Sequence, residues 1–301
     1  MTLTRRRFLT ISAVAATLPA AARADAPQLV WTGQALGARA SIRLDHPDAQ
    51  AIAARVQAEI ERLDAVFSLY RTDSALVRLN RDGRLEAPPF ELLDCLATAG
   101  AVHGASGGAF DPTVQPLWAL WAESVTAGAD PAPDAIARVA RGWAGVAFDA
   151  GAVKLAPGMA LTLNGVAQGH IADRVAALLT AEGLTGIFID TGEMRALGAS
   201  PAGGGWPVTL ESGPRIRLAS RALATSSPLG TTFDQAGRLG HILDPRTGAP
   251  VPPHWSSVSI SADSAALADA LSTAACVVET QDEITAMIAR FPGARIEALA
   301  A

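Results

Sequence analysis

The order of helical and strand-like segments constrains the fold of this chain more than any single motif. Apolar residues recur at helical spacing through Ile52, Val56, Ile60 and Leu63, which predicts an amphipathic helix there. Between residues 206 and 226, by contrast, three strand-like segments follow one another without an intervening helix. A doubly wound parallel sheet needs regular alternation, so the pattern favours an α+β fold, or a mixed α/β fold with a partly antiparallel sheet.

The first 24 residues resemble an export signal. An arginine cluster at Arg5–Arg7 is followed by an apolar run from about Phe8 and then by small residues up to Ala24. The arginine pair before Phe-Leu resembles the twin-arginine signal, so we expect residues 1–24 to be removed and the protein to be periplasmic. No cysteine follows the run, so we expect a soluble protein and not a lipoprotein; an uncleaved anchor is the alternative.

Charge and motif content narrow the possible partners and chemistry. The formal net charge is −5, so we expect no nucleic-acid partner. The P-loop, the G-x-G-x-x-G fingerprint, C-x-x-C and H-E-x-x-H are all absent. Lys154 is the one lysine and lies in a segment typical of an exposed hairpin, while Cys95 and Cys276 lie in apolar helical patterns and are interpreted as core residues. After the N-terminal run, no second hydrophobic stretch predicts a membrane span.

The apolar segment from Ala266 to Val278 carries two polar side chains at helical spacing. Asp269 and Thr273 are four residues apart, so a helix places them on one face. Two oxygens on one face make half of a site for a hard cation such as Mg²⁺. The alternative is that Asp269 is solvated near the helix start and that Thr273 bonds its own backbone.

Four other segments concentrate polar residues and glycines where loops are predicted. Residues 106–118 contain Asp111, which either lies near a ligand or caps a turn. Residues 164–175 bring glycines to a predicted helix N-terminus, which is either an anion site or a simple cap. Residues 223–230 offer hydroxyls at a strand end, and His241 precedes an Asp-Pro turn in residues 241–248, where a purely structural histidine is the alternative.

Taken together, these segments resemble the ApbE-type flavin transferases, the FAD:protein FMN transferases. The similarity runs through "SLYRTDSALVRLN", "GGAFDPTVQPL", "GHILDPRTGAPV" and "ADALSTA", in the order typical of that family. The resemblance implies a single α+β domain over residues 25–301, with a mixed, partly antiparallel sheet and flanking helices. It also implies Mg²⁺ held by the backbone carbonyl of Ala167 and the side chains of Asp269 and Thr273.

The same resemblance implies the FAD-binding residues and the reaction. The implied FAD-binding residues are Ala35, Leu36, Tyr70, Phe110, Asp111, Gln168, Asp173, Thr225 and His241. The implied reaction transfers FMN from FAD to a threonine or serine hydroxyl of an exported acceptor, such as a respiratory flavoprotein, and releases AMP. His241 is the predicted base for that hydroxyl.

Two other functions remain open on these residues. The first is an Mg²⁺-dependent FAD pyrophosphatase, in which water replaces the acceptor hydroxyl, and the second is a periplasmic FAD-binding assembly factor without turnover. Several flavin-side positions also depart from the family pattern, among them Leu36, Ala38, Gln168, and a glycine missing beside Gly192. These departures bear on FAD affinity, whereas the predicted metal ligands are intact.

Overall fold

The computed structural model describes residues 29–44, 46–200, 203–211 and 213–301. Its main element is a seven-stranded sheet in the order β1-β2-β6-β7-β10-β11-β12. These strands are β1 (Leu29–Ala35), β2 (Ala38–Leu44), β6 (Ile187–Asp190), β7 (Met194–Leu197), β10 (Ala222–Ser226), β11 (Ser257–Ala262) and β12 (Arg295–Ala300). All the described strand pairs are antiparallel, so the expected α+β class is confirmed and the antiparallel share of the sheet is larger than expected.

Two small sheets flank the main one. The first has the order β3-β5-β4, and the second is the β8-β9 pair. Their strands are β3 (Arg84–Glu86), β4 (Val146–Phe148), β5 (Ala152–Leu155), β8 (Trp206–Thr209) and β9 (Arg215–Leu218). Strands β8, β9 and β10 are the three consecutive strands that the sequence predicts between residues 206 and 226.

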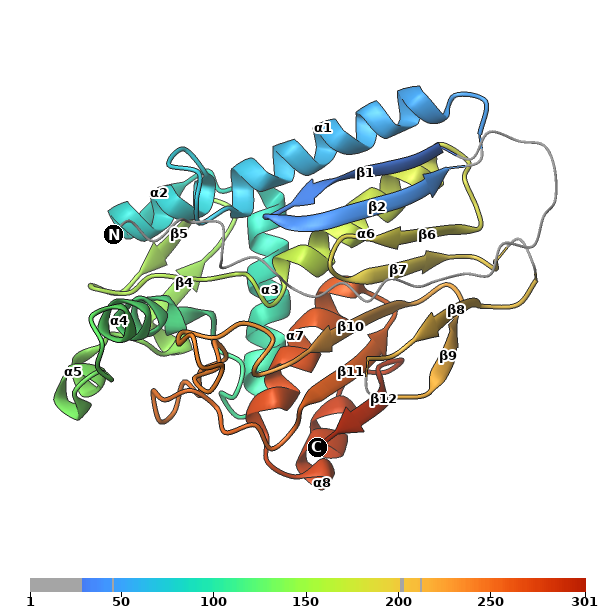
Figure 1. Cartoon of the computed structure of the whole chain (residues 1–301). Coiled ribbons are helices and arrows are strands. Elements are labelled where there is room, and N and C mark those ends of the chain that lie inside the picture. Colours follow the sequence, from blue (N-terminus) through green and yellow to red (C-terminus); the bar gives the residue numbers. More distant parts are fainter. Residues whose placement is uncertain (1–28, 45, 201–202, 212) are drawn as a thin grey trace.

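Helices pack on the main sheet and on one another (Figure 1). The α-helices are α1 (Ala49–Phe67), α2 (Ala75–Asp82), α3 (Phe90–Ala105), α4 (Gln115–Thr126), α5 (Pro133–Arg138), α6 (Ala167–Ala181), α7 (Ala265–Val277) and α8 (Gln281–Ile288). Helix α7 lies against β10 and β11, and α6 and α3 both contact α7. The principal core forms where these helices meet.

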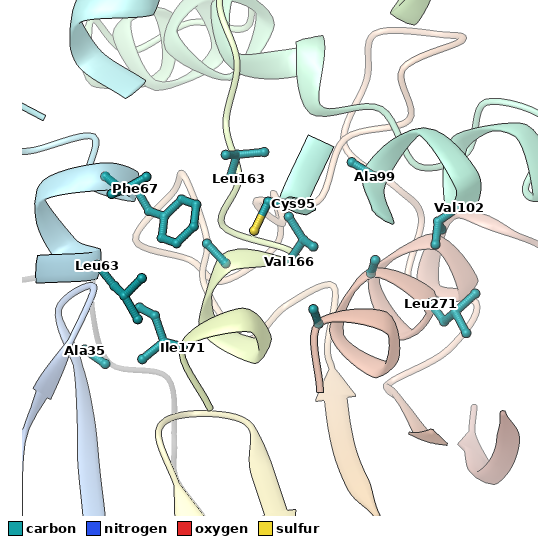
Figure 2. Packing of buried hydrophobic residues seen from close by; sticks show 14 of the residues in the cluster. Ala35, Leu63, Phe67, Cys95, Ala99, Val102, Leu163, Val166, Ile171 and Leu271 are labelled. Atoms are coloured by element: carbon teal, nitrogen blue, oxygen red, sulfur yellow. The ribbon is translucent and has the colours of Figure 1, made fainter. Parts of the chain in front are cut away.

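Figure 2 shows that core from close by. Leu63 and Phe67 of α1 face Ile171 of α6, and Cys95 of α3 lies near them. All four are at most 1% exposed. Burial of side chains this large contributes roughly 1.5–3 kcal/mol each. The predicted helical face of α1 is therefore the face that is buried, and Cys95 and Cys276 are buried free thiols, as expected.

Local chemistry explains where several elements begin and end. Ser74 caps α2 by accepting a hydrogen bond from the Val77 amide at 3.0 Å, and Gly83 ends the same helix in a left-handed conformation with φ of 67°. The β1–β2 hairpin turns on two residues, Leu36 (φ 48°) and Gly37 (φ 84°). A two-residue turn with both φ angles positive matches the twist of the strands that it joins. Leucine is rarely found in this conformation.

Three local patterns do not agree with the structure. The alanine-, glycine- and proline-rich stretch 122–133 predicts an irregular surface excursion, but α4 runs to Thr126 and so extends into it. Pro116 is compatible with that helix because it lies in the first turn, where an amide has no intrahelical partner. The apolar segment 159–163 follows the turn at Pro157-Gly158 and predicts a strand, but it is not one. Strands β3 and β7 were not predicted because each is only three or four residues long.

The predicted export signal, residues 1–24, lies outside the described residues. Within the part of the chain that the structure describes, no helix has both the length and the apolar character needed to cross a membrane.

Candidate functional site

One cavity of about 350 Å³ gathers most of the residues that the sequence marks for function. The β1–β2 turn, the segment before α4, the start of α6, the β6–β7 turn, the end of β10 and one face of α7 all line it. The predicted site residues that line this cavity are Leu36, Tyr70, Phe110, Asp111, Gln168, Thr225, His241, Asp269 and Thr273. Segments more than 200 residues apart in the sequence thus converge on one site.

Helix α7 presents Asp269 and Thr273 to the cavity from the same face, as their spacing predicts. Asp269 is only 4% exposed, and its Oδ2 accepts one hydrogen bond, from the Gly169 amide at 3.3 Å. Burial raises the pKa of Asp269 to about 8, because a carboxylate loses its hydration there. The structure therefore excludes the alternative of a solvated Asp269.

The hydroxyl of Thr273 belongs to a small cluster at the end of β10. Ser226 Oγ lies 3.3 Å from Thr273 Oγ1 and 2.8 Å from Ser272 Oγ. Ser272 Oγ in turn donates to the Asp269 carbonyl at 3.0 Å. The side of the cavity near Asp269 therefore presents mainly oxygen atoms.

Asp173 fixes the start of α7 from the neighbouring helix α6. Its carboxylate accepts hydrogen bonds from Ser264 Oγ at 2.8 Å, the Ala265 amide at 2.9 Å and the Ala266 amide at 3.1 Å. These amides are the free donors of a helix N-terminus. Asp173 does not line the cavity, so the structure places it as a support for α7 and not beside a ligand in the cavity.

Gly169 allows α6 and α7 to lie close together. A Cβ atom at this position would lie only 2.2 Å from the Ala265 carbonyl oxygen. The contact is with the backbone of α7, so it cannot be relieved by turning a side chain. Glycine is therefore required for the helix approach that brings Asp269 to the Gly169 amide.

Two further predicted residues also lie outside the cavity lining. Ala35 is 1% exposed and pairs with Ala38 across the hairpin, so it supports the turn that carries Leu36. Ala167, at the first position of α6, is 1% exposed and does not line the cavity. Gly165, two residues earlier, does line it, and a Cβ there would lie 3.0 Å from Thr273 Oγ1. The backbone of the turn before α6 therefore lies close to Thr273, and the Gly169 amide of α6 contacts Asp269.

His241 lies at the cavity on the segment after β10. Its Nδ1 is 3.0 Å from the carbonyl oxygen of Thr231. A carbonyl only accepts hydrogen bonds, so this contact places a proton on Nδ1 and leaves Nε2 with the lone pair in the neutral ring. Burial lowers the pKa of His241, against the raising effect of the Thr231 and Pro228 carbonyls, so the ring is neutral at pH 7.

An exposed aromatic side chain and a buried carboxylate lie on the other side of the cavity. Tyr70, after α1, is 61% exposed although it lines the cavity. Asp111 caps the short helix after it, because its Oδ1 accepts from the Thr113 amide at 2.9 Å. Its Oδ2 lies 3.8 Å from His103 Nδ1. The capping role that the sequence left open for Asp111 is therefore present together with its place in the cavity.

Sequence reasoning missed two carboxyl groups on the β6–β7 turn. Glu193 is 8% exposed and lines the cavity, and so does the half-buried Asp190. Burial, together with the nearby negative charges of Asp269 and Asp190, raises the pKa of Glu193 well above its usual range. The signal was a glutamate shortly after the predicted strand that ends at Asp190. That signal has no specificity without the fold that brings the turn beside α7.

The family model described as "ApbE family" matches residues 36–299, which span almost all of the described chain. The chain belongs to the ApbE family. The family predicted from the sequence is therefore confirmed, and the matched range includes every residue that lines the cavity.

Relatives and solved structures agree with that assignment. The chain is 33% identical to the FAD:protein FMN transferase of Treponema pallidum, over 78% of this chain and 73% of the relative. It is 28% identical to the FAD:protein FMN transferase of Haemophilus influenzae, over 87% of this chain and 84% of the relative. The flavinyl transferase ApbE of Pseudomonas stutzeri superposes with a TM-score of 0.76 at 27% identity, covering 87% of this chain and 88% of that one. The ApbE protein of Thermotoga maritima superposes with a TM-score of 0.78 at 28% identity, and the match covers 90% of this chain and 96% of that one. These names agree with the predicted enzyme class.

Proposed function

We propose that this ApbE-family protein is an Mg²⁺-dependent FAD:protein FMN transferase. It moves FMN from FAD to a threonine or serine hydroxyl of an acceptor protein and releases AMP. The observation that carries the proposal is that a neutral histidine, His241, a buried carboxylate, Asp269, and the partly buried Thr273 hydroxyl line the same cavity. The names of the relatives support the same activity.

The residues around Asp269 fit a hard cation. Among the described residues, no positively charged side chain acts on the Asp269 carboxylate, and its one hydrogen bond is long, at 3.3 Å. A buried carboxylate without a cationic partner is unfavourable. Asp269 and Thr273 would hold Mg²⁺, together with a backbone carbonyl from the Gly165–Ala167 turn, and all these donors are oxygens. The bound ion would offset negative charge on the pyrophosphate of FAD.

His241 is the proposed base. The acceptor hydroxyl oxygen forms a bond to the phosphorus on the riboflavin side of FAD. The bond from that phosphorus to the bridging oxygen breaks, and AMP leaves with that oxygen. The hydroxyl proton passes to Nε2 of His241, which the Thr231 contact leaves unprotonated. A positioned base of this kind typically contributes ~10²–10⁴-fold to the rate.

The cavity offers further groups for FAD. Tyr70 is an exposed aromatic ring at the cavity, and aromatic rings of this kind stack on planar heterocycles. The polar side chains of Gln168, Asp111 and Thr225 offer hydrogen-bonding groups around it. We include Leu36 and Phe110 as apolar contacts of the same ligand.

The acceptor is proposed to be an exported protein. The arginine-rich start of the chain supports export by the twin-arginine route and a periplasmic location. A respiratory flavoprotein subunit with an exported FMN domain is the acceptor class that agrees with this location.

One experiment separates the proposal from its two alternatives. The protein is incubated with FAD and Mg²⁺, with and without an acceptor domain, and AMP, free FMN and protein-bound flavin are measured. The transferase releases AMP only with the acceptor and leaves flavin on it. AMP and free FMN without an acceptor would indicate a pyrophosphatase, and bound FAD without AMP would indicate an assembly factor.

A further inference from the structure

One oxygen of Glu193 lacks a partner inside the cavity. The Glu193 side chain is more than nine-tenths buried, and its Oε2 has no hydrogen-bond partner. The backbone amide of Thr225, on β10, donates to the same carboxyl group. One end of the group is therefore held by the sheet while the other is left for a ligand. Buried polar atoms are nearly always hydrogen-bonded in folded proteins, so a free one needs an explanation.

The backbone holds Glu193 firmly in place. Its carbonyl accepts a hydrogen bond from the Thr191 amide at 3.1 Å, and the Gly192 amide donates to Asp190 Oδ1 at 3.2 Å. Gly192 has φ of 98°, which favours glycine, and Gln168 packs near it. Hydrogen bonds therefore fix the turn that precedes Glu193, and this pre-positions the free oxygen.

The surroundings restrict what this oxygen can bind. Asp269 and Asp190 are its electrostatic neighbours, so a phosphate oxygen would be repelled. Among the described residues, no group of three or more His, Cys, Asp or Glu side chains is placed to hold a metal ion, so the three carboxyl groups do not form a joint metal cage. A hydroxyl group fits best, because it donates to a carboxylate and also accepts from a carboxylic acid.

We propose that Glu193 binds a sugar hydroxyl of FAD, on the ribityl chain or on the ribose. This inference rests on the proposed function, because it takes FAD as the occupant of the cavity. The sugar hydroxyls flank the pyrophosphate, so they are the FAD donors nearest to a phosphate held beside Asp269. An acidic side chain reads ribose hydroxyls in the same way in other dinucleotide sites.

The test measures binding and not turnover. Dissociation constants for FAD, FMN and ADP are measured by calorimetry in EDTA, for the wild type and for Glu193→Ala. We expect FAD binding to weaken by about 10–100-fold, since a hydrogen bond to an ionisable buried group is lost. If the affinity for FMN falls as much as that for FAD and the affinity for ADP does not fall, the hydroxyl is on the ribityl chain. If the affinity for ADP falls and that for FMN does not, the hydroxyl is on the ribose.

Glu211→Gln is the matched control, because Glu211 also lines the cavity but is exposed. It also removes a carboxyl group from the cavity lining, and we expect a change in FAD affinity of less than about threefold. Glu193→Gln is the second variant in case the alanine variant does not fold, because it keeps the side-chain volume. We expect it to give the same pattern across the three ligands with a smaller loss.

Two results would overturn the inference. The first is unchanged affinity of the Glu193 variants for all three ligands in EDTA. The second is a loss that occurs only when Mg²⁺ is present, which would reassign Glu193 to support of the ion. Failure of the wild type itself to bind FAD would count against the proposed function as a whole, so the two failures are distinguishable.

Discussion

The close approach of α6 and α7 predicts that Gly169→Ala is strongly destabilising. The new Cβ would lie 2.2 Å from the Ala265 carbonyl oxygen, 2.4 Å from the carbonyl carbon and 2.5 Å from the Ala266 amide nitrogen. Normal contacts between such atoms are about 3.5 Å, so the two helices must separate by about 1 Å. The contact is between backbone and Cβ, and rotamer changes cannot relieve it.

The expected loss in the free energy of unfolding has two contributions. Overpacking of this kind costs about 1–3 kcal/mol. Separation of the helices also stretches the hydrogen bonds from Ser264, Ala265 and Ala266 to the Asp173 carboxylate, and weakening these adds about 1–2 kcal/mol. We therefore expect a loss of about 3 kcal/mol in the free energy of unfolding. The melting temperature of a chain of this size then falls by about 6–12 °C.

Calorimetric and urea unfolding check this value, with Gly104→Ala as the control. Gly104 is an exposed residue of α3, and a Cβ there meets nothing within 4 Å. We expect that variant to be unchanged or more stable by up to about 1 kcal/mol, since alanine favours helix more than glycine. Gly169→Ala with wild-type stability would refute the close packing of α6 on α7.

The remaining predictions concern the site and the signal. Asp269→Ala should abolish Mg²⁺-dependent FMN transfer and keep the fold, as checked by transfer at limiting Mg²⁺ and by circular dichroism; full activity would contradict the proposed ligand. His241→Gln should lower turnover by ~10²–10⁴-fold while its affinity for FAD stays within a few-fold of the wild type. A variant that binds FAD poorly but turns over normally at saturation would show that His241 contacts the ligand and is not the base. Because burial lowers the pKa of His241, the acid limb of the wild-type activity should lie at a lower pH than that of an ordinary histidine, whose pKa is about 6.5. This limb should vanish in the variant. Replacing Arg5, Arg6 and Arg7 by lysine should keep the protein in the cytoplasm, and unchanged periplasmic recovery in a fractionation assay would contradict a twin-arginine signal.

Much of the fold was predictable because local patterns agree with the final packing. Helix α3 begins at Phe90, directly after two prolines, and runs to Ala105, as the sequence indicates. Helix α4 was not predicted, because Pro116 and the alanine-, glycine- and proline-rich stretch from residue 122 are typical of loops. Three-residue strands such as β3 exist only because they pair with β5, and no local pattern specifies that pairing.

The site shows the same division between local and tertiary information. The spacing of Asp269 and Thr273 was sufficient to predict a shared helix face. The role of Asp173 was not, because its three donors lie about 90 residues away on α7. Glu193 was missed for a related reason: it reaches the cavity only because the β6–β7 turn packs beside α7 and β10.

The central claim is that this protein places FMN covalently on another protein. Its most direct test is the intact mass of an acceptor domain after incubation with the protein, FAD and Mg²⁺, followed by peptide mapping. The account predicts one added FMN phosphoester on a threonine or serine, with one AMP released per acceptor. It also predicts no addition when that residue is replaced by alanine. AMP production without any mass added to the acceptor would contradict the account.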